Sequence, residues 1–281
     1  MKKIVLLTLL CISTLLAQTF TFTAIPDQDE TMLKERFSKL AVYLSAELNV
    51  PVKFVPVKSY AASISAFRNN QVQLAWFGGL SGVRARLLVK DSYAIAQGVE
   101  DPNFHSYIIA NTSTGLTKSE LLPKGIEGKT FTFGSKGSTS GRLMPEFFIR
   151  QELKKSPKEV FSKVGFSGNH SKTISLVQSG AYQVGAVNFK VWERDLKNGK
   201  IDPSKVKVIW KTPAYPDYQF TIRGDVDKTF GKGFAAKVQT ALIKLDDKNI
   251  LEAFPRKRLI EAKSSDFDPI LTVGQKIGLL D

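Results

Sequence analysis

The strongest constraint on the fold is an alternation of strand-like and helix-like segments that runs through the chain twice. Apolar runs bounded by Gly, Pro and Asn alternate with segments whose apolar residues recur every three to four positions. The first round predicts strands over Phe20–Ile25, Val52–Val55, Leu74–Phe77, Ala94–Val99 and Tyr107–Ala110, and helices over Met32–Glu47, Tyr60–Phe67 and Gly79–Leu88. Such alternation predicts parallel sheets covered by helices on both faces, an α/β architecture.

The alternation restarts after the polar stretch Asn111–Gly115, which has the character of a crossing between domains. The second round predicts strands over Thr130–Phe133, Val184–Val187 and Val206–Trp210, and helices within Ser138–Lys154, Ser171–Ser179 and Phe189–Leu196. A second crossing at Pro213 and Pro216 leads to a last strand, Gln219–Ile222, and to helices over Phe234–Leu245 and Asn249–Phe254. We therefore expect two lobes, residues 18–111 plus 215–281 and residues 112–214, with a hinge and a ligand-binding cleft between them.

The first 17 residues have the three-part layout of a secretory signal peptide. Lys2 and Lys3 precede the uncharged apolar run Ile4–Leu16, and Ala17 closes that run with a small residue. The run is shorter than the roughly 20 apolar residues that cross a membrane, and no later segment approaches that length. We expect a signal peptide over residues 1–17, cleaved after Ala17, and a periplasmic protein. The alternatives are a buried first strand and a signal anchor.

The cysteine and charge content narrow the chemistry of the mature chain. The one cysteine, Cys11, lies inside the predicted signal peptide, so we expect no disulfide, no thiol chemistry and no metal site of cysteine and histidine. Removing Lys2 and Lys3 lowers the formal net charge from +14 to +12, an excess that suits nucleic acid, an anionic membrane or a small anion. Scattered basic residues and export disfavour nucleic acid. A small anion is therefore the favoured partner.

Residues that could carry chemistry gather in Phe131–Pro145, which reads FTFGSKGSTSGRLMP. A helix N-terminus offers unpaired N–H groups and a partial positive charge, and glycines let the backbone close on a ligand. Ser138, Thr139 and Ser140 can add hydroxyl donors around a tetrahedral oxyanion. The alternative is that Ser138 or Ser140 only caps the helix. Neither a Walker A sequence nor a GxGxxG fingerprint is present, which argues against a nucleotide enzyme.

Four segments, taken in chain order, are similar to those of a known family of binding proteins. They are SYAASISAFRNNQVQLAWFGGLS (Ser59–Ser81), FTFGSKGSTSG with the following Pro145, NHSKTISLVQSGAYQVGAVN (Asn169–Asn188) and VIWKTPAYPDY (Val208–Tyr218). Residues 20 to 255 thereby resemble the solute-binding proteins of ATP-binding-cassette (ABC) importers for phosphonates, phosphite and related oxyanions. The resemblance implies the two-lobed periplasmic binding protein fold (type II-like), with a hinge and an interlobe cleft.

The resemblance implies ligand-binding roles for residues of both predicted lobes. Tyr60 matches a tyrosine that hydrogen-bonds the anion from the first lobe. Ser138, Thr139 and Ser140 match a cradle of hydroxyl and amide donors in the second lobe, and His170 matches a histidine donor to the same group. His170 also precedes a predicted helix, so an imidazole and a helix N-terminus can converge there. The alternative for His170 is a surface cap.

Some residues of this chain depart from the family pattern at positions that would contact the part of the ligand beyond its oxyanion group. Relatives that take aminoalkylphosphonates hold the ammonium group with acidic residues, and near those places this chain has Lys190, and Tyr218 beside Asp217. A tyrosine of the family pocket is replaced by Phe104, with His105 adjacent. Unless Lys190 points to solvent, these changes favour a small anion such as phosphite, methylphosphonate, phosphate, selenate or sulfate.

Three further residues complete the predicted ligand-binding set. Asn188, at the end of a predicted strand, could donate its amide into the cleft or serve in a turn. Tyr215 carries a hydroxyl that can donate to an oxyanion, although most aromatic residues near these motifs are expected to pack as core or pocket wall. His105 is included because it neighbours a pocket position. Asp217 is the nearby carboxylate that could accept a proton from phosphite or phosphate.

Together these inferences predict the substrate-binding component of an ABC importer for a small tetrahedral oxyanion. The anion enters an open cleft, the lobes close on it, and the closed monomer docks on a membrane permease, without a cofactor or a covalent step. Two other functions stay open: a sensor that docks on a membrane histidine kinase, and a secreted phosphoesterase that uses Ser138 or Ser140 with His170. Catalysis is disfavoured because no GxSxG elbow and no paired carboxylates are evident.

Overall fold

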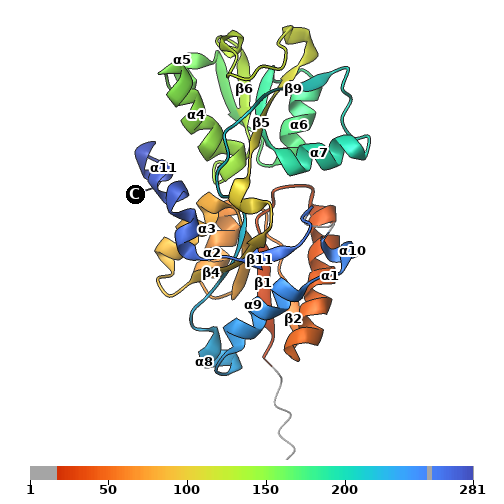
Figure 1. Ribbon diagram of the computed structural model, residues 1–281, viewed down its shortest axis with the longest axis vertical. Helices are drawn as coiled ribbons and strands as arrows, with labels where there is room; N and C mark the ends of the chain where they lie inside the picture. Colours follow the sequence, from red (N-terminus) through yellow and green to blue (C-terminus); the bar gives the residue numbers. More distant parts are fainter. Residues whose placement is uncertain (1–17, 252–254, 281) are drawn as a thin grey trace, which may run out of the picture.

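The computed structural model describes residues 18–251 and 255–280, which form two α/β lobes stacked along the long axis of the molecule (Figure 1). The lower lobe in this view contains the first and last parts of the chain, and the upper lobe contains the middle part. The predicted signal peptide, residues 1–17, lies outside the described residues. No helix of the described part combines the length and apolar character needed to cross a membrane. The two-lobed α/β prediction is confirmed.

A six-stranded sheet forms the centre of the first lobe, in the order β11-β4-β10-β3-β1-β2. Its strands are β1 (Phe20–Ala24), β2 (Val52–Phe54), β3 (Leu74–Phe77), β4 (Tyr93–Gly98), β10 (Gln219–Ile222) and β11 (Leu259–Glu261). β1 is parallel to β2 and β3, whereas β10 is antiparallel to β3 and β4, and β11 is antiparallel to β4. The prediction of parallel sheets is wrong for part of this sheet, because β10 returns from the other lobe, begins beside the carboxyl end of β3 and runs antiparallel to it.

A five-stranded sheet forms the centre of the second lobe, in the order β7-β6-β8-β5-β9. Its strands are β5 (Ser106–Asn111), β6 (Thr130–Phe133), β7 (Lys163–Phe166), β8 (Val184–Asn188) and β9 (Val206–Lys211). β5 pairs along its whole length with β8 and β9, antiparallel to both. The predicted boundary after residue 111 therefore needs correction, because β5 belongs to the second sheet and the first crossing precedes Ser106.

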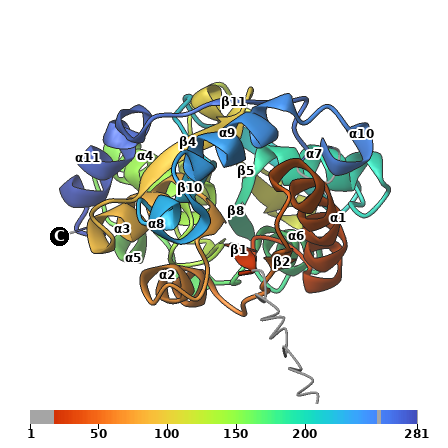
Figure 2. The ribbon, with the colours of Figure 1, turned by 90° about the horizontal axis from the view of Figure 1, so that it is seen from below.

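Helices cover the faces of both sheets. Those of the first lobe are α1 (Glu30–Leu48), α2 (Tyr60–Arg68), α3 (Gly79–Leu88), α8 (Val226–Phe230), α9 (Phe234–Lys244), α10 (Lys248–Leu251) and α11 (Asp268–Lys276); those of the second are α4 (Met144–Leu153), α5 (Pro157–Val160), α6 (His170–Gln178) and α7 (Phe189–Lys197). Figure 2 shows α1 and α3 on opposite sides of the first sheet. The helix predicted over Asn249–Phe254 coincides with α10 only at its start, and residues 252–254 are outside the described part.

The longest helix, α1, illustrates how the sequence builds the first lobe. Asp29 caps it by accepting hydrogen bonds from the N–H groups of Thr31 and Met32. Six of its apolar residues recur at helical spacing and are buried: Leu33, Phe37, Leu40, Ala41, Leu44 and Leu48. Phe37 stacks on Phe54 of β2 with the ring centres 5.0 Å apart. This helix therefore forms where the amphipathic pattern predicted it.

The two crossings between the lobes run side by side as an antiparallel pair. The N–H of Phe104 donates to the carbonyl of Tyr215 at 2.9 Å, and the N–H of Tyr215 donates to the carbonyl of Phe104 at 3.0 Å. The N–H of Asp217 also donates to the carbonyl of Asp101 at 3.0 Å. The carboxyl ends of β1 and β3 face those of β6 and β8 beside this connection, which is where open α/β sheets bind ligands.

Candidate functional site

Predicted ligand-binding residues from both lobes converge where the lobes meet. Each of the following is at most 4% exposed: Tyr60, Ser138, Thr139, Ser140, His170, Asn188 and Tyr215. Tyr60 begins α2 in the first lobe, whereas the serines, the threonine and His170 belong to the second. A direct contact joins the two sides, since the N–H of Leu80 in α3 donates to Thr139 Oγ1 at 2.9 Å. The lobes are therefore closed over this site.

Ser138, Thr139 and Ser140, named here the oxyanion cradle, lie in the connection between β6 and α4. The Ser138 hydroxyl accepts a hydrogen bond from the N–H of Gly141 at 2.9 Å, so it does cap a helical turn. That turn, Thr139–Leu143, is a single wide π-type turn, a form frequent at functional sites. A Cβ at Gly141 would lie 2.9 Å from Ser138 Oγ and 3.0 Å from Cε1 of His170. Glycine is therefore required for the cradle to approach His170.

Tyr60 faces the cradle from the first lobe. Ser59 caps α2 through the N–H of Ala62, which fixes Tyr60 as the first helical residue. Burial raises the pKa of the Tyr60 hydroxyl well above the ordinary value, although the nearby Ser138 side chain acts in the opposite direction. A Cβ at Gly137 would lie only 3.1 Å from Cβ of Tyr60, so the cradle loop and α2 are in close contact. Tyr60 thus keeps its proton and stays a neutral hydrogen-bond donor.

His170 is buried at the start of α6 and is held as a neutral imidazole. Its Nδ1 accepts the N–H of Asn188 at 3.3 Å, which leaves the proton on Nε2. Nε2 lies 3.5 Å from the Tyr218 hydroxyl. Burial lowers the pKa of His170 to about 4, although the nearby Asp27 carboxylate acts in the opposite direction. His170 is therefore an uncharged N–H donor at neutral pH and not a surface cap.

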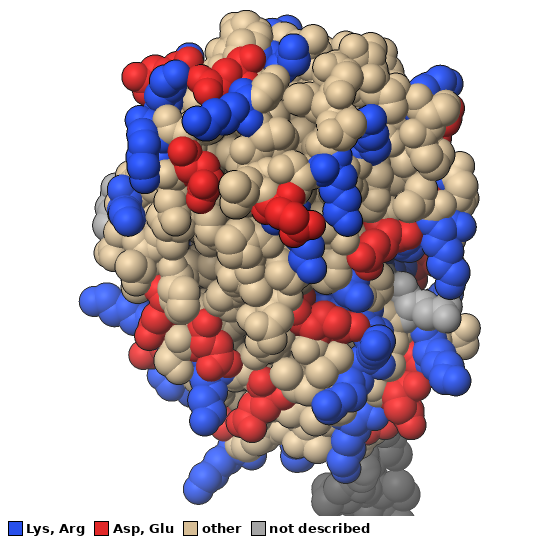
Figure 3. All heavy atoms as spheres, turned by 45° about the horizontal axis from the view of Figure 1, so that its top comes forward, with Lys and Arg blue, Asp and Glu red and all other residues tan. Residues whose placement is uncertain are grey.

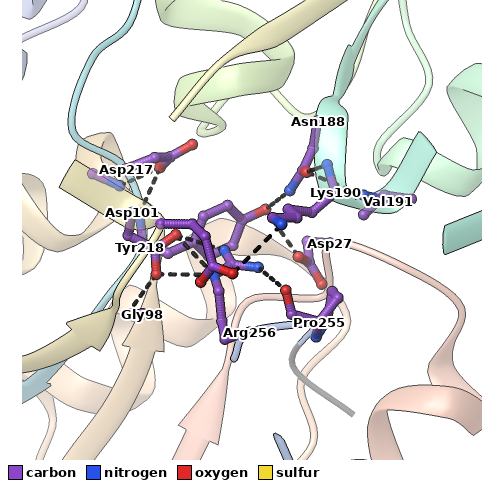
Figure 4. Close-up of polar contacts among 12 residues, drawn as sticks. Asp27, Gly98, Asp101, Asn188, Lys190, Val191, Asp217, Tyr218, Pro255 and Arg256 are labelled. Atoms are coloured by element: carbon purple, nitrogen blue, oxygen red, sulfur yellow. Dashed lines mark hydrogen bonds and ion pairs between the residues drawn. The ribbon is translucent and has the colours of Figure 1, made fainter. Parts of the chain in front are cut away.

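The Tyr218 hydroxyl connects the lobes at the floor of the site (Figure 4). It donates to Asp27 Oδ2 of the first lobe at 2.9 Å and accepts from Asn188 Nδ2 of the second lobe at 2.8 Å. The Tyr218 ring stacks on Trp76 with the ring centres 5.5 Å apart. These contacts fix the direction of the hydroxyl, because its one proton is already committed to Asp27.

The Asp217 carboxyl group points to the cradle. Its Oδ1 accepts the N–H of Gly79 at 2.8 Å and the N–H of Tyr218 at 3.0 Å. Its Oδ2 is buried and has no hydrogen-bond partner among the described residues. Burial raises the pKa of Asp217, while the backbone donors and the neighbouring hydroxyls of Thr139 and Ser140 lower it. The site therefore contains a buried carboxylate oxygen that makes no hydrogen bond among the described residues and has the Thr139 and Ser140 hydroxyls in its neighbourhood.

Tyr215 and Asn188 support the site through neighbours. The Tyr215 hydroxyl hydrogen-bonds to Ser106 Oγ. Ser106 Oγ in turn donates to the carbonyl of Ser140 at 2.7 Å, so Tyr215 supports the backbone of the cradle through Ser106. Asn188 performs the turn role considered above, since its Oδ1 caps α7 by accepting the N–H groups of Lys190 and Val191. Its amide NH₂ donates to Tyr218, as described above.

His105 and Lys190, both predicted to bind ligand, have their polar partners elsewhere. His105 Nδ1 lies 2.9 Å from the carbonyl oxygen of Thr212, and its ring meets Phe189 edge-on. Lys190 Nζ lies 3.5 Å from Glu100 Oε1. A catalytic Ser138–His170 pair is likewise not formed: the Ser138 hydroxyl accepts the N–H of Gly141, and Nδ1 of His170 accepts the N–H of Asn188.

Three residues of this region escaped the sequence analysis. Asp27 lies between the predicted strand Phe20–Ile25 and the predicted helix Met32–Glu47 and was given no role, although a polar residue just past the carboxyl end of β1 is a signal for a site residue. Arg256 and Asp101 form a fully buried ion pair at 2.7 Å, with the guanidinium 5.0 Å from the centre of the Tyr218 ring (Figure 4). No sequence signal connects these two residues, since 155 positions separate them.

The charged side chains do not form one basic patch on the face shown in Figure 3, where Lys and Arg are mixed with Asp and Glu. Within residues 18–251 and 255–280, no cluster of three His, Cys, Asp or Glu side chains is placed to hold a metal ion. The described residues of the site are accordingly neutral donors and backbone amides beside the carboxyl groups of Asp27 and Asp217. This donor set suits an anion that carries a proton.

Comparisons with known proteins identify the family to which the chain belongs. A sequence model described as "ABC transporter, phosphonate, periplasmic substrate-binding protein" matches residues 22–267. The chain is 41% identical over 261 residues to the probable ABC transporter phosphite binding protein PhnD1 of Prochlorococcus marinus (strain MIT 9301), covering 90% of this chain and 88% of that protein. It is 25% identical over 217 residues to the phosphonates-binding periplasmic protein of Escherichia coli K12, covering 75% and 63%.

Solved structures give the same result. The structure of PhnD1 from Prochlorococcus marinus (MIT 9301) in complex with methylphosphonate superposes with a TM-score of 0.89 at 40% identity, covering 93% of this chain and 99% of that one. A binding component of an ABC phosphonate transporter from Pseudomonas aeruginosa shares the fold, with a TM-score of 0.78 at 21% identity over 92% and 85% of the chains. The chain belongs to the phosphonate family of periplasmic substrate-binding proteins, which are transport components of ABC importers and not enzymes.

Proposed function

We propose that this protein captures a small phosphorus oxyanion, either methylphosphonate or phosphite, in the closed interlobe site and delivers it to an ABC permease. One observation carries the proposal: neutral donors from both lobes converge on a buried point beside an unsatisfied carboxylate oxygen, Asp217 Oδ2. The names of the relatives, a phosphite-binding protein and a complex with methylphosphonate, support the same ligand class.

The donors that would surround the anion are the side chains of Tyr60 and His170 and the hydroxyls and amides of the cradle. Helices α2, α3 and α6 begin at Tyr60, Gly79 and His170, so three helix N-termini lie at the site. Their partial positive charge stabilises a bound anion without a full positive charge in contact with it. The net charge of the chain would then help to attract the ligand, while the neutral donors hold it.

The carboxylate of Asp217 favours a ligand that retains one proton. Monoprotonated phosphite or methylphosphonate can donate its P–OH to Asp217 Oδ2, whereas sulfate and selenate have no proton to donate. A sulfate ion would instead place an oxygen against a buried carboxylate oxygen, and an unmet buried polar group costs about 1–3 kcal/mol. We therefore expect sulfate and selenate to bind this protein more weakly than phosphite and methylphosphonate.

Titration calorimetry with phosphite, methylphosphonate, phosphate, sulfate and 2-aminoethylphosphonate tests this proposal. We expect phosphite and methylphosphonate to bind most tightly and 2-aminoethylphosphonate weakly, because the Glu100 carboxylate is already paired with Lys190 and is not free to hold the ammonium group. Tight binding of 2-aminoethylphosphonate together with weak binding of phosphite would refute the ligand assignment. Ligands enter by the cleft mouth, where a cavity of about 350 Å³ is lined by residues of both lobes, including Tyr60, Ser135, Asn169 and Lys172.

Three properties of the mature protein belong to this proposal. Cleavage after Ala17 would release it into the periplasm, and N-terminal sequencing of the exported protein tests this. It would act as a monomer, which light scattering during gel filtration tests. Its two lobes would divide at the crossings near Phe104 and Tyr215, and ligand-dependent hydrogen exchange at these crossings tests that division.

A further inference from the structure

One face of α7 in the second lobe is directed at the first lobe. Lys190 and Arg194 are four residues apart and therefore share that face. Lys190 Nζ lies 3.5 Å from Glu100 Oε1, and Arg194 Nη1 donates to Oε1 of Gln28, a residue between β1 and α1. Asn188, the N-cap of the same helix, donates to Tyr218 at 2.8 Å. Lys190 and Arg194 thus extend the interlobe contact outward from the site.

Glu100, which pairs with Lys190, is a largely buried carboxylate. The side chains of Glu100 and Lys190 are 17% and 19% exposed, so the ion pair is partly withdrawn from water. Both carboxylate oxygens of Glu100 are buried and make no hydrogen bond among the described residues. The other cation that acts on Glu100 is Arg256, which is already paired with Asp101. A carboxylate in such a place depends on its cationic neighbours, because desolvation disfavours an unpaired charge.

We infer that the pairs Lys190–Glu100 and Arg194–Gln28 form an interlobe latch that sets ligand affinity without touching the ligand. The inference rests on the proposed function, since it concerns the closed state in which the oxyanion is held. Rotation of the lobes apart separates α7 from Gln28 and Glu100, so the latch exists only in the closed form. A contact that exists only in the binding-competent state raises that state's population and tightens the apparent affinity.

The latch predicts a kinetic signature. Ligand leaves only after the lobes open, and opening breaks both latch contacts, so weakening them accelerates dissociation. Association begins from the open form, where the contacts are absent, so its rate constant changes little. Truncating one member of a partly buried charge pair acts in this way on dissociation in protein complexes. The role of Lys190 is then to hold the closed lobes together.

The test uses methylphosphonate as the probe and the variants Lys190→Met, Glu100→Gln and the double variant. We expect each single variant to bind about five- to tenfold more weakly, through faster dissociation measured by stopped-flow tryptophan fluorescence, which is the range of a contact worth about 1 kcal/mol. The double variant binds no more weakly than the weaker single one, because both changes break the same pair. Lys197→Met is the matched control, since Lys197 is exposed on the same helix, and it binds as the wild type does.

Other results would overturn the latch in distinct ways. If Lys190 touched the ligand, Lys190→Met would weaken binding while Glu100→Gln left it unchanged or improved it. If Lys190 only attracted the anion, association would slow and dissociation would stay constant. Binding by both single variants within twofold of the wild type also contradicts the latch. Because the reversed pair Lys190→Glu with Glu100→Lys retains the ion pair, we expect it to recover affinity over either single reversal. If the wild type bound no oxyanion, the proposed function would fail, not the latch.

Discussion

The substitution Asp217→Asn tests most directly how the site distinguishes its ligands. Asparagine is nearly isosteric with aspartate, and its carbonyl oxygen can still accept the N–H groups of Gly79 and Tyr218, which lie 2.8 and 3.0 Å from Oδ1. The buried Oδ2, which has no partner among the described residues, becomes an NH₂ group. The change therefore keeps the support of α3 and turns one acceptor facing the cradle into a donor.

The expected magnitude follows from the bond that is lost. A hydrogen bond to a charged group contributes about 1.5–3 kcal/mol, which corresponds to a roughly 10- to 100-fold change in affinity. Monoprotonated phosphite or methylphosphonate should lose that factor, because its P–OH would then face a donor. Sulfate should bind equally well or better, because the buried carboxylate charge is gone. The ratio of phosphite to sulfate affinity should therefore fall by at least tenfold.

Titration calorimetry with phosphite and sulfate at pH 6.5 and pH 8.5 measures this ratio. Wild-type affinity for phosphite should fall at the higher pH as the proton is lost from the ligand, and the Asn variant should show a smaller fall. Asp27→Asn is the control, because Asp27 is a buried carboxylate of the same region whose Oδ2 already accepts the Tyr218 hydroxyl. If the ratio of phosphite to sulfate affinity were unchanged in Asp217→Asn, Asp217 would not accept a hydrogen bond from the P–OH of the ligand.

Further predictions concern the cradle and His170. Ser138→Ala removes the acceptor for the Gly141 N–H and one ligand donor, so it should cost about 1 kcal/mol of stability in urea unfolding and about tenfold in ligand affinity. Gly141→Val places a side chain where a Cβ already lies 2.9 Å from Ser138 Oγ, and calorimetry should detect no ligand binding while circular dichroism stays native. Burial lowers the pKa of His170 to about 4 from 6.5, so its contribution to stability is complete above pH 6.5 and is lost as the pH falls towards 4. In phosphate-free buffer, the stability difference between wild type and His170→Gln should shrink by about 3 kcal/mol between pH 7.5 and pH 4, and a constant difference would contradict a neutral, buried His170.

Local patterns predicted most elements because the relevant signals are local. The spacing of apolar residues predicts α1, and the pair Gly78-Gly79 predicts the end of β3; each signal spans only a few neighbouring residues. The structure has α1 at Glu30–Leu48, and β3 ends at Phe77. The missed strands lie at sheet edges: β7 contains a glycine, and β11 has only three residues. The helices α5, α8 and α11 were also missed. Strand direction was also missed, because the direction of β10 depends on the path of the chain between the lobes.

The site was predicted unevenly for a similar reason. Ser138, Thr139, Ser140 and His170 sit at strand–helix junctions, where glycine, hydroxyl and N-cap residues mark the helix start. Lys190 was interpreted from its expected position near the ligand, yet its distance to Glu100 depends on how far the lobes close. The pairing of Arg256 with Asp101 depends on bringing the last part of the chain to the hinge, which no local pattern encodes.

The paired crossings described above also restrict how the lobes can move. Phe104 and Tyr215 exchange both backbone hydrogen bonds, so the two connections form a narrow two-stranded ribbon and cannot twist independently. A ribbon of this kind bends easily across its flat face and resists shear and rotation about other axes. We therefore expect the lobes to rotate apart mainly about one axis, so that the route into the site opens on the side of the molecule opposite these two connections. Stiffening the ribbon would slow capture and release together while leaving every ligand-contacting atom in place.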